Sequence, residues 1–335
     1  MPPSEPISRA CSAEIWRRDA AFGPSYTCPS KGENVPLWIP ITIAAALFQN
    51  IRTTMQQKIR HVLSVDGANF IRYLYGAPLA LGMLAFLVWG TGRHMPSLPF
   101  PFLWKVTVAG LGQIIATSLM IHAFSLRNYA VGTVYSKTET LFVALFSTFV
   151  ASEPLTLGSW IGILVCLGGV AILSVRGSFT NIRSVLADLT HKGALFGILS
   201  GIFFALAAGM IRLASKDLTS GDFMIRGITT LATMNSIQIV LMFAYLCYSD
   251  RSQFGKIGVN WRSSIWVGIF SVLGSAGWAL AMTLENAALV RAVGQIELVF
   301  TFIASHVVLK ERPSAGEWLG SLLVVGGVVL ILLER

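Results

Sequence analysis

Long apolar runs and short polar breaks alternate along the chain from residue 36 to its end. Each run is about as long as the twenty residues that an α-helix needs to cross the hydrocarbon core of a bilayer. The breaks are rich in Gly, Pro, Ser and Asn, which favour turns and loops. The pattern predicts an all-α integral membrane protein with ten transmembrane helices, at residues 37–57, 68–90, 102–124, 130–151, 156–175, 193–213, 223–248, 263–284, 288–309 and 314–333.

The composition agrees with a membrane location. Hydrophobic residues make up 54% of the 335 residues and charged residues only 12%, about half of the roughly 25% that is usual in soluble domains. The formal net charge is +9, but the basic residues lie mainly in the connections, where they interact with lipid headgroups. Membrane lipids are therefore expected partners, and nucleic acid is not.

The sequence holds no familiar motif for catalysis or cofactor binding. Its four cysteines lack the spacing of a metal site, and it has no Walker, zinc-protease or nucleophile-elbow motif. We therefore expect no cofactor, no metal site and no enzymatic activity.

The chain repeats itself. Similar residues recur in the second half of the chain, and the residue numbers of most matched pairs differ by 158. Two pairs near the start of each half differ by 154. The matched pairs include Glu139 with Glu297, Trp160 with Trp318, Gly162 with Gly320, Gly169 with Gly327, Gly67 with Gly221 and Arg72 with Arg226. Five spans in each half, an odd number, predict two inverted five-helix repeats. The expected parts are a polar tail (1–35), a first repeat (36–175), a connecting loop (176–192) and a second repeat (193–335).

The two segments SEPLTLGSWIGILVCLGGVAIL and KERPSAGEWLGSLLVVGGVVLIL resemble the end of a repeat of the EamA family, in the drug/metabolite transporter superfamily. The resemblance covers about residues 36–335. It implies a secondary active transporter, an exporter of small polar metabolites such as amino acids and related compounds, in the inner membrane with both termini in the cytoplasm. The Lys and Arg residues of the connections favour neither side.

Two carboxylates are expected near the middle of the membrane. Glu139 and Glu297 are each the tenth residue of a predicted span. A charge there costs at least about 2.5–3.5 kcal/mol, and desolvation favours proton uptake by a carboxylate. We therefore interpret the two residues as a substrate- or proton-binding pair in a proton-coupled transporter. A structural role, hydrogen bonding to a neighbouring helix, stays open.

Lys137 breaks the symmetry of the two halves, because its counterpart is Gln295. This difference favours a role in binding an anionic group of the substrate. The alternative is a structural ion pair with a carboxylate of another helix. Arg291, near the start of the matching span, is interpreted as an interfacial anchor.

Other polar residues in the spans are expected to line a cavity. Helical spacing places Gln113 and Thr117 on one face of the span 102–124. The matched residues Ser271 and Ser275 share a face of the span 263–284. The complete set of predicted substrate- or proton-binding residues is Lys137, Glu139, Glu297, Gln295, His122, Gln113, Thr117, Ser271, Ser275, Trp278, Tyr135, Gln49 and Thr53.

Glycines at regular spacing in the spans 156–175 and 314–333 indicate close helix packing. Glu153 and Glu311 precede these two spans and are expected to cap them. Two other functions stay possible for the chain, a membrane-embedded lipid-modifying enzyme and a non-transporting membrane scaffold. The five histidines do not cluster as such an enzyme would require.

Overall fold

The computed structural model describes residues 35–59, 61–126, 136–174, 192–300 and 315–333, which form helices and, within these ranges, no strand. The apolar runs form helices because a helix satisfies every backbone hydrogen bond internally. The first half contains α2 (Trp38–Ile59), α3 (Val65–Ala85) continued by the π-helical turn η1 (Phe86–Gly90), α4 (Phe100–Leu126), α6 (Glu139–Phe149) and α7 (Leu157–Ser174). The second half contains α9 (Lys192–Asp217), α10 (Phe223–Ser249), α11 (Ser252–Val259), α12 (Trp261–Leu284), α13 (Ala287–Gly294) and α15 (Ala315–Leu333).

A helix lies in each of the ten predicted spans, but the structure does not contain ten uninterrupted membrane-crossing helices in its described part. Among the described residues, five helices are long and apolar enough to cross a membrane, those that include α3, α4, α9, α10 and α12. The predicted spans 130–151 and 288–309 are broken, and the described helices α6 and α13 are short. The short helix α11 was not predicted. The exact limits of the tail, repeats and connecting loop stay predictions.

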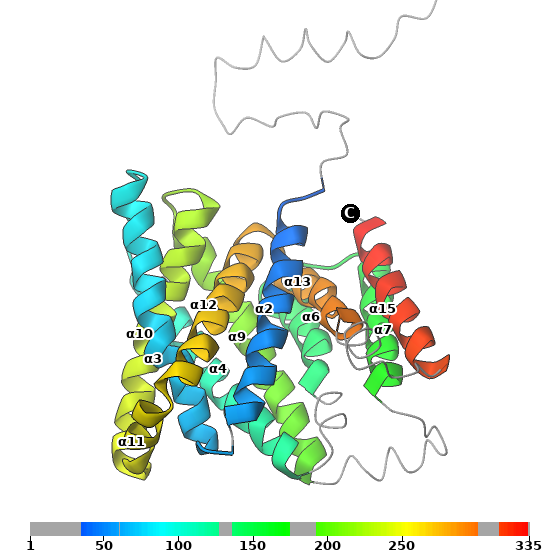
Figure 1. Ribbon diagram of the computed structural model, residues 1–335. Helices are drawn as coiled ribbons and strands as arrows, with labels where there is room; N and C mark the ends of the chain where they lie inside the picture. Colours follow the sequence, from blue (N-terminus) through cyan, green and yellow to red (C-terminus); the bar gives the residue numbers. More distant parts are fainter. Residues whose placement is uncertain (1–34, 60, 127–135, 175–191, 301–314, 334–335) are drawn as a thin grey trace, which may run out of the picture. The chain divides into compact units, whose positions relative to one another are not determined.

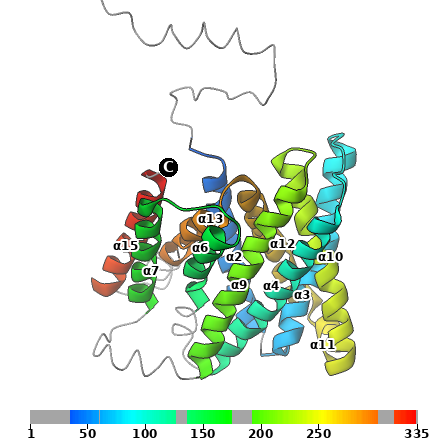
Figure 2. The ribbon, with the colours of Figure 1, turned by 180° about the vertical axis from the view of Figure 1, so that it is seen from behind.

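The helices pack in a reciprocal order. Three helices of the first repeat contact the matching helix of the second repeat. These pairs are the second helices (α3 with α10), the fourth (α6 with α13) and the fifth (α7 with α15). The first and third helices exchange partners, because α2 packs on α12 and α4 packs on α9. In Figure 1, α2 begins at the upper side and descends, whereas its counterpart α9 begins at the lower side and ascends; Figure 2 shows the same from behind.

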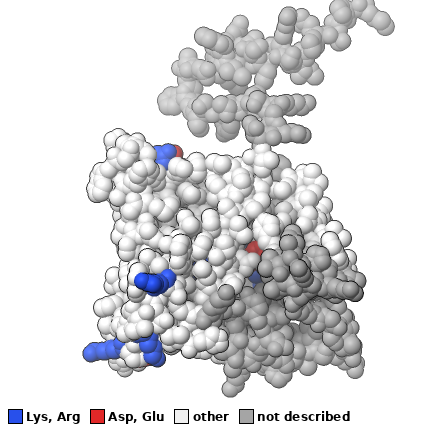
Figure 3. Space-filling view, viewed as in Figure 1, with Lys and Arg blue, Asp and Glu red and all other residues white. Residues whose placement is uncertain are grey.

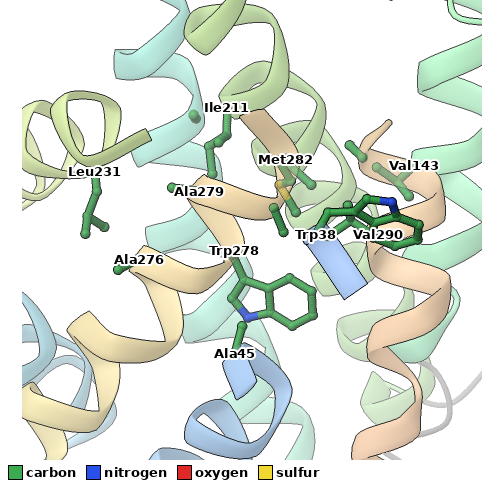
Figure 4. Packing of buried hydrophobic residues seen from close by; sticks show 14 of the residues in the cluster. Trp38, Ala45, Val143, Ile211, Leu231, Ala276, Trp278, Ala279, Met282 and Val290 are labelled. Carbon is green, nitrogen blue, oxygen red and sulfur yellow. The ribbon is translucent and has the colours of Figure 1, made fainter. Parts of the chain in front are cut away.

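The core lies where the central helices meet. A large apolar cluster joins residues of α2, α9, α10, α12 and α13. In Figure 4, the side chain of Trp278 points from α12 toward α2 and lies beside Ala45. Few charged side chains reach the described part of the face in Figure 3, as expected for a surface in contact with lipid.

The helices α7 and α15 approach closely at their glycines. A Cβ atom on Gly169 would lie 2.7 Å from the carbonyl oxygen of Gly320, and one on Gly327 would lie 2.7 Å from that of Gly162. The predicted close packing is therefore present. The predicted cap is wrong for Glu153, because the hydroxyl of Thr156 accepts the hydrogen bond from the Ser159 amide at 3.1 Å instead. Glu311 lies outside the described residues.

Candidate functional site

Both broken helices are interrupted beside their charged residues. Residues 136 and 137 are helical, Thr138 is in a turn, and α6 then starts at Glu139. In the second half α13 ends at Gly294, Gln295 is in a turn, and the helix resumes over residues 296–300. The two breaks therefore lie at nearly the same repeat position. They place the ends of short helices, and with them Glu139 and Glu297, in the interior of the bundle.

Ion pairs between the repeats lie at both breaks. Lys137 of the first repeat forms an ion pair with Glu297 of the second. In the opposite sense, Arg291 of the second repeat lies with its Nε 3.0 Å from Oε1 of Glu139 of the first. These two atoms meet the distance of an ion pair but not the geometry of a hydrogen bond. Each repeat thus provides a cation for the carboxylate of the other.

The pairs are joined by polar side chains of α2 and α12. Gln49 donates a hydrogen bond of 3.3 Å to Oε2 of Glu297 and accepts one of 2.9 Å from the indole nitrogen of Trp278. The guanidinium of Arg291 lies over the face of the same indole, 4.4 Å from the ring centroid, which is a favourable cation–π arrangement. Trp278 therefore holds Arg291 on its face and Gln49 at its edge.

A small pocket, partly open to solvent, lies beside this network. Three arginines from three helices contribute to its lining, Arg52 of α2, Arg72 of α3 and Arg291 of α13. The other lining residues are Gln49, Gln113, Phe204, Ile211, Met234, Phe270, Ser271, Gly274, Ser275 and Trp278. The pocket is thus polar and basic on part of its wall and apolar on the rest.

The structure places five of the predicted residues in the wall of this pocket, Gln49, Gln113, Ser271, Ser275 and Trp278. Thr117 is fully buried behind it and accepts a 2.6 Å hydrogen bond from Arg72. Lys137, Glu139 and Glu297 form the adjoining ion pairs.

The remaining predicted residues lie elsewhere. Gln295 donates to the hydroxyl of Thr140 at 2.6 Å, which ties the two broken helices together. Thr53 donates to the carbonyl of Gln49 within its own helix at 2.9 Å. His122 is exposed and does not line the pocket. Tyr135 lies outside the described residues.

Sequence reasoning missed the three arginines of the pocket. Arg291 was expected to be an interfacial anchor, but its side chain is 7% exposed and paired with Glu139. Arg72 was noted only because it matches Arg226. Arg52 lies at helical spacing from the polar residues Gln49 and Gln56 of α2. Its position on this polar face was the signal that could have predicted a role in the pocket.

Comparison with known proteins agrees with the architecture. The model of the EamA-like transporter family matches residues 36–175 and 191–333, one match in each half. A solved structure described as "Crystal structure of protein" is similar, with a TM-score of 0.66 and 18% sequence identity over 89% of this chain and 97% of that one. This likeness shows the fold alone. No curated protein matches the chain.

Proposed function

Because the chain belongs to the EamA-like transporter family, we propose that this multi-pass membrane protein is a secondary active transporter that exports a small polar metabolite by alternating access. The observation that carries the proposal is the polar pocket at the centre of the bundle, next to ion pairs that join the repeats. A buried charge in a membrane is costly and is typical of a substrate or ion pathway.

The arrangement of the helices supports an inverted repeat. Three helices pack on their own counterparts, two exchange partners, and α2 and α9 run in opposite directions. A two-fold relation of this kind places the binding site between the repeats. Movement of one repeat against the other would expose the pocket to each side of the membrane in turn.

The two carboxylates are the proposed coupling groups. A proton on Glu297 removes the charge that holds Lys137, and one on Glu139 does the same for Arg291. Protonation would therefore loosen the contacts between the repeats, which links proton uptake to the conformational change. The proposed location is the inner membrane with both termini in the cytoplasm.

The test is efflux from proteoliposomes loaded with a metabolite extract of the expression host, with and without a pH gradient. We expect specific metabolites to leave protein-containing vesicles faster than protein-free ones, and a pH gradient to change the rate. Gly168→Ala is a matched control, because a Cβ on Gly168 meets no atom within 4 Å. Retention of every metabolite would contradict the proposal and favour a scaffold. A changed lipid composition of the vesicles would favour a lipid-modifying enzyme.

A further inference from the structure

We propose that the pocket binds an organic anion, a molecule with a carboxylate or phosphate group, and that Arg52 and Arg72 hold this group. The inference rests on the proposed function, since it names the class of metabolite that the transporter carries. It is carried by two buried guanidinium groups that face one pocket without a carboxylate partner in the described part of the chain.

Arg72 is 2% exposed, and its hydrogen bonds go to neutral hydroxyl groups. Its Nη1 donates to Thr117 at 2.6 Å and its Nε donates to Ser271 at 3.1 Å. These contacts fix the plane of the guanidinium without neutralising its charge. A fixed planar guanidinium with unused donors matches the geometry of a carboxylate or phosphate.

The guanidinium of Arg52 has fewer hydrogen-bond partners than that of Arg72. Arg52 is 6% exposed, its Nη2 donates a long hydrogen bond of 3.4 Å to Thr53, and its Nε has no partner. A buried guanidinium donor without a partner is unfavourable in the absence of a ligand. Arg52 and Arg72 line the same pocket from α2 and α3 of the first repeat, so one anionic group can accept hydrogen bonds from both.

The charges of the site agree with an anion. Of the described residues, four cations, Arg52, Arg72, Lys137 and Arg291, and two carboxylates, Glu139 and Glu297, lie in and beside the pocket. The carboxylates are paired with Lys137 and Arg291, which leaves two positive charges. A cationic ligand would add to this excess, whereas one dianion or two single negative charges would balance it.

The rest of the wall indicates that the anion has an apolar part. Phe204, Ile211, Met234 and Phe270 line the pocket along with the arginines. These four apolar side chains offer inorganic phosphate or sulfate no hydrogen-bond partner, but they favour contact with a carbon skeleton. The ligand is therefore an organic anion, with its charged group at the arginines and its carbon skeleton against α9, α10 and α12.

Arg226 is a natural control for this argument. It occupies the position of Arg72 in the second repeat, yet its Nε and Nη2 both donate to the backbone carbonyl of Ser215, at 3.0 and 2.6 Å. It does not line the pocket. Two matched arginines thus have different surroundings, and only Arg72 faces the space for a ligand.

The binding experiment uses three fractions of a metabolite extract of the expression host, separated on ion-exchange resins into anions, neutral molecules and cations. Thermal unfolding of the purified full-length protein is followed by tryptophan fluorescence with each fraction. We expect the anionic fraction to raise the unfolding temperature of the wild type and of Arg226→Gln. In Arg52→Gln and Arg72→Gln, about ten- to hundredfold more of this fraction should be needed for the same shift.

The variants Arg52→Lys and Arg72→Lys serve where a glutamine variant does not fold. They keep the charge but lose the planar fork, so an intermediate loss of affinity is expected. The proposal is overturned if only the neutral or cationic fraction stabilises the wild type, or if no fraction does. It is also overturned if the pocket variants respond like the wild type, or if inorganic phosphate and sulfate are the only stabilising anions.

The efflux assay separates this inference from the proposed function. Stabilisation by the anionic fraction without export of any metabolite would refute transport but leave the anion site intact. Export of neutral or cationic metabolites alone would keep the transporter and refute the anion site.

Discussion

Lys137 and Glu297 form an ion pair between the two repeats, although they are 160 residues apart in the chain. Glutamine replaces the lysine at the matched position in the second half, and Gln295 bonds instead to Thr140. The asymmetry seen in the sequence thus has a structural counterpart, because Lys137 supplies the cation that the carboxylate of the second repeat needs.

Neutralising one member of this pair should destabilise the protein. Lys137→Gln leaves Glu297 without its cation, and Glu297→Gln leaves the lysine without its carboxylate, at a cost of about 3–5 kcal/mol in the free energy of unfolding. The double variant should recover a large part of this loss. Denaturant unfolding of the four proteins measures the coupling.

Lys216→Gln is the matched control for that cycle. Lys216 also pairs with a carboxylate, Glu153, but its side chain is 44% exposed and Glu153 keeps Arg212 as a second partner. Its loss should cost less than about 1 kcal/mol. If Lys137→Gln is as stable as the wild type and instead raises the Km for the substrate, Lys137 binds the ligand and the structural interpretation fails.

Glu139→Gln should reduce transport more than stability. The amide keeps the shape of the side chain, and Arg291 still stacks on Trp278, but the residue no longer titrates. The pH dependence of efflux should therefore weaken. Efflux at the wild-type rate with an unchanged pH profile would exclude Glu139 from coupling.

Neighbouring glycines of α7 should respond oppositely to alanine. Gly169→Ala places a Cβ 2.7 Å from the Gly320 carbonyl oxygen, so α15 must move away and the unfolding temperature should fall. Gly168→Ala meets no atom within 4 Å and gains up to about 1 kcal/mol from helix propensity. Gly327→Ala and Gly326→Ala repeat the comparison on α15. Equal unfolding temperatures for Gly168→Ala and Gly169→Ala would show that the helices are not in close contact.

Acid should release α11 from the start of α3. Hydrogen bonds from Ser252 and then Gln253 lower the pKa of Asp250, which lies in the connection between α10 and α11. Gln253 in turn accepts a 2.9 Å hydrogen bond from the Ser64 amide. Since the folded pKa is the lower one, this stabilisation is present at neutral pH and is lost as the pH falls through that pKa.

Hydrogen exchange of residues 252–259 measures this effect. We expect faster exchange at acid pH once the rates are corrected for the chemical dependence on pH, and the Asp250→Asn variant should show part of it at neutral pH. Corrected rates that are independent of pH in the wild type would contradict the role of Asp250.

The sequence contained much of the fold and only part of the site. The apolar runs predicted the helices, because a segment that crosses a membrane must be apolar. Matched pairs such as Trp160 and Trp318 indicated the repeat, because a duplication leaves similar residues at a constant spacing. Neither pattern reports which helices meet. That Arg291 stacks on Trp278 and pairs with Glu139 depends on how α13 crosses α6 and α12. A basic residue near the start of an apolar run was therefore interpreted as a headgroup anchor.

The contact between α7 and α15 has a consequence for how the chain is held together. These last helices of the two repeats interlock at Gly162, Gly169 and Gly327, and α2 and α4 pack against α12 and α9 of the second repeat. Such mutual contacts make the peptide link between the repeats redundant once the bundle has assembled. Two separately synthesised fragments, divided between residues 176 and 191, should therefore associate in the same membrane.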